Sequence, residues 1–170
     1  IRDGLAPNIV TAEELGERLQ SEETGYQINT SANTLAFLQF SSGTTGVPKA
    51  VEYGHKAVTM AAIHVKYGIG LREDDIYFCP SSPAWGMGIW YGTIGPLIFG
   101  NAIGGYSGRF DAGRLIEALD ELQVTNVFAA PLVYRRIMES DRLNDYHLKL
   151  RRMTYTGGKL DMDVIQFYQE

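Results

Sequence analysis

Nine consecutive residues in this chain carry the groups best suited to hold a phosphate. They read Ser41-Ser42-Gly43-Thr44-Thr45-Gly46-Val47-Pro48-Lys49. Glycines let the backbone approach a ligand closely, so that successive N–H groups point at one anion, while hydroxyl groups and a lysine ammonium add further donors. The pattern therefore favours a polyphosphate ligand. It is not a Walker A loop, because alanine rather than serine or threonine follows the lysine.

The residues on either side of this phosphate loop (residues 41–49) indicate which elements hold it. An apolar run of strand length covers residues 34–40 and leads directly into the loop, and a short extended piece over 50–53 follows it. A strand that runs into a polar loop is the place where α/β folds bind ligands. The loop is thus expected at the end of a strand in such a fold.

The rest of the chain alternates between strand and helix patterns. Helices are predicted from residue 11, over 55–67, over 85–99 as a buried helix, over 111–122 with Asp111 as N-cap, over 131–140 with Pro131 in the first turn, and from Asp161; strands are predicted over 76–79, 101–106, 124–129 and 151–155. This alternation predicts an α/β fold with a mainly parallel sheet and right-handed crossover helices. No repeat or linker divides the chain, so one unit is expected.

Composition argues against several classes of function. The chain has 170 residues, a formal net charge of -5 and one cysteine. The acidic balance gives no basic surface for nucleic acid, and no nucleic-acid partner is expected. A lone Cys79 cannot form an internal disulfide, which favours a cytoplasmic location and a structural thiol. The uncharged residues 76–108 are long enough to span a bilayer, but prolines and glycines interrupt them, so no membrane partner is expected. His55 and His64 lack the spacing of a metal pair, and no metal site is predicted within the chain.

The phosphate loop, together with the preceding Phe40, resembles the signature loop of the adenylate-forming superfamily, which includes acyl-CoA synthetases, adenylation domains and luciferases. The segment Ala84-Trp85-Gly86-Met87 is similar to the one that lines the acid pocket in acyl- and aryl-CoA ligases. We expect Trp90, a little further on, to be a core residue.

Two later segments extend the resemblance. Residues 126–131, with Tyr134 and Arg135, are similar to a strand-to-helix element of acetyl- and medium-chain acyl-CoA synthetases, although we interpret Arg135 as a surface ion-pair partner. Residues 156–160 stand where the family has Gly-Glu-Pro-Leu against the adenine ring. Gly158 and Lys159 replace the family's Glu and Pro there. Without the resemblance, Gly157-Gly158 could equally be a tight turn.

The resemblance implies an ATP-dependent, AMP-forming carboxylic acid:CoA ligase. The expected partners are a small carboxylic acid, ATP and CoA, with Mg²⁺ held by an acidic residue beyond Glu170. Thr45 and Lys49 are the expected catalytic residues. The residues expected to bind ATP are Ser41, Ser42, Gly43, Thr44, Thr45, Gly46, Lys49, Gly157, Gly158 and Lys159. The residues expected to line the acid pocket are Ala84, Trp85, Gly86, Met87 and Thr156.

The same resemblance implies that residues 1–170 are a fragment of the large N-terminal domain, without the C-terminal domain, and inactive alone. Two alternatives remain open. The parent could be an adenylation domain that loads a carrier protein, or a non-catalytic module that binds a nucleotide or phosphate. The Ala-Pro-x-x-Tyr-Arg stretch at 130–135 and the glycine-rich residues 84–100 favour the CoA ligase over the carrier-loading domain.

Overall fold

The computed structural model describes residues 27–41, 46–105 and 108–169. By its contacts the chain divides into two units, Ile1–Thr30 and Ser31–Glu170. Of the first unit, residues 27–30 are described; they are exposed and have no regular secondary structure. The helix predicted from residue 11 lies outside the described residues.

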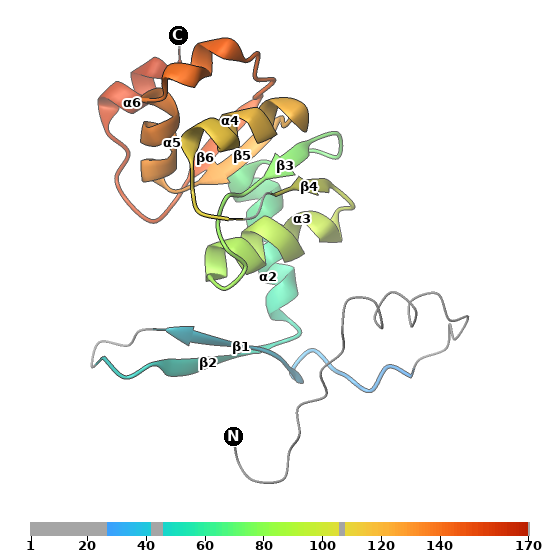
Figure 1. Cartoon of the computed structure of the whole chain (residues 1–170). Helices are drawn as coiled ribbons and strands as arrows, with labels where there is room; N and C mark the ends of the chain where they lie inside the picture. The colour runs from blue at the N-terminus through green and yellow to red at the C-terminus, as the bar shows by residue number, and fades with distance from the viewer. Residues whose placement is uncertain (1–26, 42–45, 106–107, 170) are drawn as a thin grey trace. The chain divides into compact units, whose positions relative to one another are not determined.

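The described part of the second unit contains two separate sheets (Figure 1). β1 (Leu35–Ser41) and β2 (Lys49–Gly54) form an antiparallel hairpin. β3 (Ile76–Phe78), β4 (Ala102–Gly104), β5 (Asn126–Ala129) and β6 (Arg152–Tyr155) form a parallel sheet in the order β4-β3-β5-β6. The predicted α/β fold with a mainly parallel sheet is therefore confirmed. The strand before the phosphate loop, however, belongs to the hairpin and not to the parallel sheet. The short phosphate loop can reverse the chain between two antiparallel strands, whereas two parallel strands must be joined by a longer crossover connection.

Helical segments connect the strands of the parallel sheet. They are α2 (Ala57–Ile63) with the π-helical η1 (His64–Ile69), the π-helical η2 (Met87–Ile94) with α3 (Gly95–Ile98), α4 (Ala112–Glu121), α5 (Pro131–Met138), the 3₁₀ turn η3 (Asp141–Asp145) and α6 (Met162–Phe167). Three predicted helix starts, at Asp111, Pro131 and Asp161, are confirmed, and Asp161 is the N-cap of α6. The Asp111 carboxylate accepts a hydrogen bond from the Arg114 N–H at 2.8 Å, and Pro131 stands in the first turn of α5.

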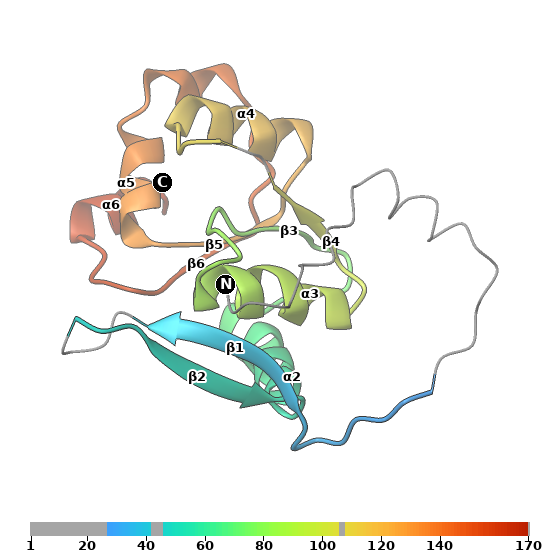
Figure 2. The ribbon, with the colours of Figure 1, turned by 60° about the horizontal axis from the view of Figure 1, so that its bottom comes forward.

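The core lies on both faces of the parallel sheet. On one face Phe78 and Val127 pack against buried residues of α4, α5 and α6, and on the other Tyr77 and Phe128 pack against Val65 and its neighbours in η1. Alternate residues of a strand point to opposite faces, so consecutive residues of β3 and β5 serve different layers. Figure 2 shows α4, α5 and α6 on one side of the sheet and α2 and α3 on the other.

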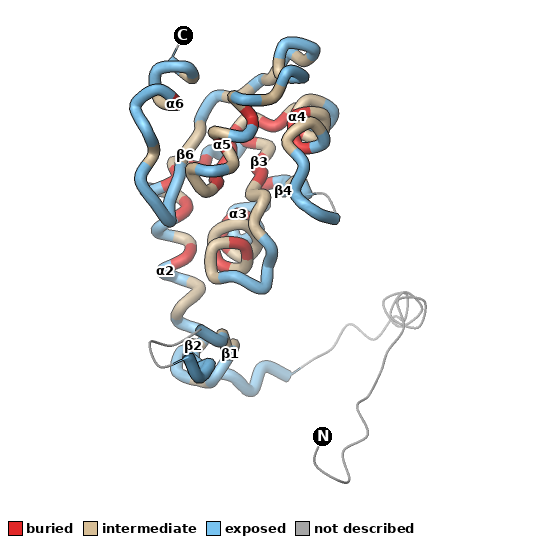
Figure 3. Tube along the Cα trace, turned by 60° about the vertical axis from the view of Figure 1, so that its left-hand side comes forward, coloured by how far each residue is buried: buried red, intermediate tan, exposed pale blue. Residues whose placement is uncertain are grey.

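The segment predicted as a buried helix over 85–99 is helical but only partly buried. Trp90 is buried as expected, yet Trp85 is 70% exposed, and Leu97 and Ile98 are exposed as well. The expectation of full burial is wrong because one side of the segment packs on the sheet and the hairpin, while nothing described covers the other. Figure 3 shows this mixture of buried and exposed residues, and a hairpin that is mostly exposed.

Gly88, in the first turn of η2, is held too closely to accept a side chain. A Cβ there would lie 2.2 Å from the Ser82 carbonyl oxygen and 2.5 Å from that of Ser81. We expect Gly88→Ala to lower the free energy of unfolding by about 1–3 kcal/mol, because backbone must move to make room. Urea denaturation measures this change. Gly105→Ala, where no atom lies within 4 Å of the added Cβ, is the matched control. Equal stability of the two variants would contradict the expectation.

Candidate functional site

The β1–β2 hairpin holds the two ends of the phosphate loop together. Ser41 pairs directly with Lys49 across the hairpin, so the two side chains lie on the same face of the ribbon. Gly46 adopts a φ of +79° with no atom within 4 Å of a built Cβ, which is the left-handed conformation that glycine favours. All three residues are exposed. The other predicted loop residues, Ser42, Gly43, Thr44 and Thr45, lie outside the described residues.

The hairpin packs against η2, and this contact places the strand that leads into the phosphate loop beside the predicted acid-pocket segment. The rings of Phe37 and Tyr53 lie 5.6 Å and 5.1 Å from the Trp90 ring, measured between centroids. Because side chains alternate along β1, Phe37, Gln39 and Ser41 point to this same side of the hairpin. Sequence reasoning did not identify Phe37 and Tyr53 as positioning residues. No sequence pattern singles them out, because Leu38 and Phe40 on the opposite, exposed face of β1 are apolar too.

The four residues of the pocket segment (residues 84–87) do not gather around one cavity in the described chain. Ala84 and Trp85 are exposed, and the Trp85 N–H donates to the Ser82 carbonyl at 3.0 Å. Gly86 lies against β1, at the Gln39 side chain. Met87 packs instead toward the sheet, against the core cluster that contains Tyr77 and Phe128. Their assignment to an acid pocket stays a prediction.

The second group of predicted ATP-binding residues lies at the carboxyl edge of the parallel sheet. A cavity of about 340 Å³ opens there, at the ends of β5 and β6. Its lining includes Pro131, Leu132, Arg135, Gly157, Gly158, Lys159 and Asp161. The neighbouring ends of two parallel strands and the turns that follow them are where α/β folds place ligands. The structure therefore brings Gly157, Gly158 and Lys159 together, while exposed Thr156 is not among the lining residues.

The two cationic side chains that line this cavity, Arg135 and Lys159, differ in whether an acidic side chain already pairs with them. Arg135 pairs with Asp161 at the start of α6 and with Asp163 at 3.4 Å, which confirms its interpretation as an ion-pair partner. The hydrogen bond to Asp161 and the nearby Asp163 charge raise the pKa of Arg135. Lys159 has no ion-pair partner within the described ranges, so its ammonium is available to a ligand. Gly157 has a φ of +87° and forms the turn that leads to Lys159.

Three other cavities contain no predicted site residue. One, of about 680 Å³, is lined by residues of β2 and α2 and by Trp90 and Tyr91 of η2. Another, of about 690 Å³, lies at the ends of β3 and β4 and is lined in part by Cys79, Ser81 and Thr93. Burial raises the pKa of the Cys79 thiol to about 11, so the group is protonated at neutral pH, in agreement with a structural role.

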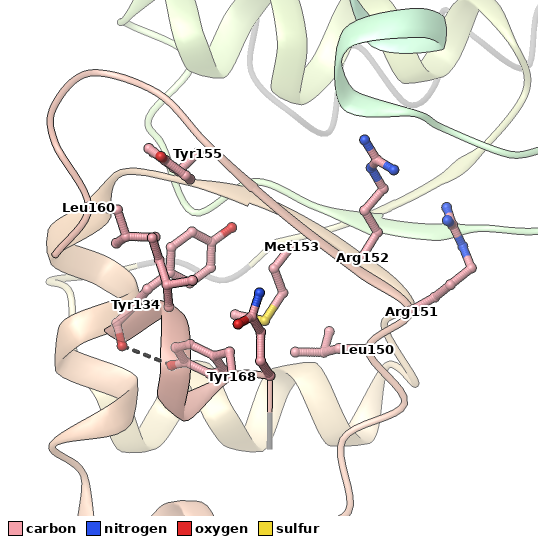
Figure 4. Close-up of a pocket in the computed structure, with 10 residues that line it drawn as sticks. Tyr134, Leu150, Arg151, Arg152, Met153, Tyr155, Leu160 and Tyr168 are labelled. Carbon is pink, nitrogen blue, oxygen red and sulfur yellow. Dashed lines mark hydrogen bonds between the residues drawn. The ribbon is translucent and has the colours of Figure 1, made fainter. Parts of the chain in front are cut away.

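The third of these cavities, of about 340 Å³, lies between β6, α5 and α6 (Figure 4). Tyrosine and apolar side chains such as Tyr134, Met153 and Leu160 line it. The Tyr168 hydroxyl donates to the Tyr134 carbonyl at 2.8 Å and ties α6 to α5. This cavity is a gap in the packing of the helices on the sheet rather than part of the predicted site.

The described residues contain no group of three His, Cys, Asp or Glu side chains able to hold a metal ion. Within the same residues, no helix is both long and apolar enough to cross a membrane.

Comparison with known proteins identifies the family. The model of the AMP-binding enzyme family matches residues 5–170, and the chain belongs to this family of adenylate-forming enzymes. It is 33% identical over 135 residues to an acetyl-coenzyme A synthetase of Bacillus subtilis (strain 168), covering 76% of the chain and 23% of that protein. It is 30% identical over 166 residues to the 4-hydroxybenzoate--CoA/benzoate--CoA ligase of Rhodopseudomonas palustris, covering 96% of the chain and 30% of that protein.

A solved structure shows the same fold. The acyl-CoA synthetase of Brucella canis superposes with a TM-score of 0.80 over 98% of this chain and 31% of that one, at 23% sequence identity. The chain thus spans less than a third of the length of each of these proteins.

Proposed function

We propose that the chain is part of the large N-terminal domain of an ATP-dependent, AMP-forming carboxylic acid:CoA ligase. The observation that carries the proposal is the hairpin that places Ser41 opposite Lys49 and packs beside Gly86. In this arrangement the phosphate loop offers hydrogen-bond donors to phosphate oxygens, and the pocket segment beside it is proposed to bind the acid. The matches to an acetyl-coenzyme A synthetase and to a benzoate--CoA ligase support the CoA ligase rather than a carrier-loading domain or a non-catalytic module.

The proposed reaction has two halves. A carboxylate oxygen attacks the α-phosphorus of ATP and pyrophosphate leaves; the thiol of CoA then attacks the acyl carbon and AMP leaves. Charge builds up on phosphate oxygens in the first half, so positioned donors supply much of the rate enhancement. Thr45 and Lys49 are the proposed catalytic donors, with the other phosphate-loop residues and Gly157, Gly158 and Lys159 binding ATP. A Mg²⁺ ion would neutralise phosphate charge, with its protein ligand proposed to follow Glu170.

The proposed acid pocket consists of Ala84, Trp85, Gly86, Met87 and Thr156. Its remaining wall would come from residues beyond this chain. A cytoplasmic enzyme fits the single cysteine, whose thiol stays reduced in that compartment.

Acid-dependent exchange of radiolabelled pyrophosphate into ATP tests the proposal. We expect the full-length parent to catalyse exchange with a panel of aliphatic and aromatic acids, and the 170-residue chain to show none, because catalysis needs the proposed Mg²⁺ ligand and second domain. A full-length protein that binds ATP but exchanges with no acid would favour the non-catalytic module. Exchange by the 170-residue chain alone would contradict the expectation that it is incomplete. A parent that exchanges but transfers the acyl group only to a carrier protein would contradict the CoA step.

A further inference from the structure

The Gln39 side chain of β1 lies against the position that a Cβ atom on residue 86 would occupy. A Cβ built on Gly86 would lie 3.0 Å from the Gln39 amide nitrogen and 3.3 Å from its amide oxygen. Gly86 itself has a right-handed helical backbone, with φ of -55° and ψ of -37°, which alanine also adopts. Backbone conformation therefore does not require glycine here, and a methyl group at this position would need the Gln39 amide to shift by a few tenths of an ångström.

The position of Gln39 is set by the hairpin. Phe37, two residues earlier on the same face of β1, packs edge-on against Trp90, and Tyr53 packs against the same ring from β2. Both contacts hold β1 against η2, so the half-buried Gln39 side chain is held over the start of that helix. Its amide makes no hydrogen bond to the described residues. No polar partner in the described part of the chain therefore fixes the amide, and the position of β1 places the side chain beside Gly86.

We propose that Gln39 is a specificity-determining residue, whose side-chain volume forms the wall of the acid pocket at Gly86. The inference rests on the proposed function, which assigns the pocket segment to the acid. Gln39 lies two residues before Ser41, so the strand that carries the phosphate loop also limits the length of acid that fits beside it. Removing the bulk of Gln39 lengthens the pocket toward β1, and adding a methyl group at Gly86 shortens it.

The experiment compares variants of the full-length parent over a series of straight-chain acids from propionate upward. Gln39→Ala removes the volume, Gln39→Leu keeps most of it without the amide, and Gly86→Ala adds a methyl group beside it. Gln166→Ala, at an exposed residue of α6, is the matched control. For each variant kcat/KM is measured for every acid and KM for ATP, together with the urea midpoint as a check of folding.

For each variant, kcat/KM for the acid one or two carbons longer than the wild-type optimum is divided by kcat/KM for propionate. We expect this ratio to be about tenfold higher in Gln39→Ala than in wild type, the usual effect of a methylene in an apolar pocket. Gln39→Leu should keep the wild-type profile, Gly86→Ala should disfavour longer acids, and the double variant should recover them. KM for ATP should stay unchanged. The control should match wild type.

An equal loss of kcat/KM for all acids in Gln39→Ala would show a purely structural role and overturn the inference. A shift in Gln39→Leu as large as that in Gln39→Ala would overturn it too, because the amide rather than its volume would then decide specificity. If wild type exchanges with no acid, the proposed function itself fails, and that result is distinct from an unchanged acid profile in an active enzyme.

Discussion

Lys49→Ala in the full-length parent is expected to slow acyl-adenylate formation by about 10²-fold or more, because it removes a cation from phosphate oxygens whose charge grows in the transition state. The register of the hairpin places Lys49 opposite Ser41 at the mouth of the phosphate loop, and Lys49 is exposed. Within the described ranges its ammonium pairs with no carboxylate. The unfolding midpoint should therefore be unchanged while kcat falls. Single-turnover measurement of adenylate formation reads the effect directly.

Two further variants make this test specific. Lys56→Ala removes an equally charged side chain just beyond β2, where the ammonium donates to the Asn33 side-chain oxygen at 2.9 Å, and it should leave the rate nearly unchanged. Lys49→Arg keeps the charge with a different geometry and should recover part of the rate. If Lys49→Ala kept near-normal pyrophosphate exchange, or if it raised KM for the acid without lowering kcat, the proposed role of Lys49 would be wrong.

Arg151→Ala is expected to destabilise the fold by about 3 kcal/mol, because it leaves a buried carboxylate without its cation. Asp75 is only 4% exposed, and its Oδ1 accepts a hydrogen bond from Arg151 Nε at 3.0 Å. Thr125 and Asn126 also donate to this carboxylate, at 2.8 Å and 3.1 Å. These contacts join the starts of β3, β5 and β6. Arg152→Ala, at the exposed neighbouring residue, should cost far less.

The pH dependence of stability gives a second measure of the same ion pair. Burial alone would raise the pKa of Asp75, but Arg151 and the hydrogen-bond donors outweigh it and hold the pKa well below its usual range. The folded pKa is thus lower than the unfolded value near 3.8. The stabilisation is present above that value and is lost as the pH falls through it toward the folded pKa. Urea midpoints at pH 7, 5 and 3 should fall steeply for wild type below pH 4 and less steeply for Arg151→Ala. Parallel pH profiles would contradict this expectation.

The sequence by itself determined the family, the α/β fold and several element boundaries. The phosphate loop, the Asp111 cap and Pro131 in the first turn of α5 depend on neighbours within a few residues, so a local pattern is enough to predict them. The regular alternation of strand and helix likewise predicted the parallel sheet, because short strands with intervening helices must cross over to pair.

Only the tertiary structure decided which sheet holds the phosphate loop and what lies against the pocket segment. The strand before the loop pairs with the one after it rather than with the parallel sheet, and its Gln39 reaches Gly86. The bond between Asp75 and Arg151 joins residues that are 76 positions apart. No local pattern encodes such contacts, because they form only when the packing of whole elements brings distant side chains together.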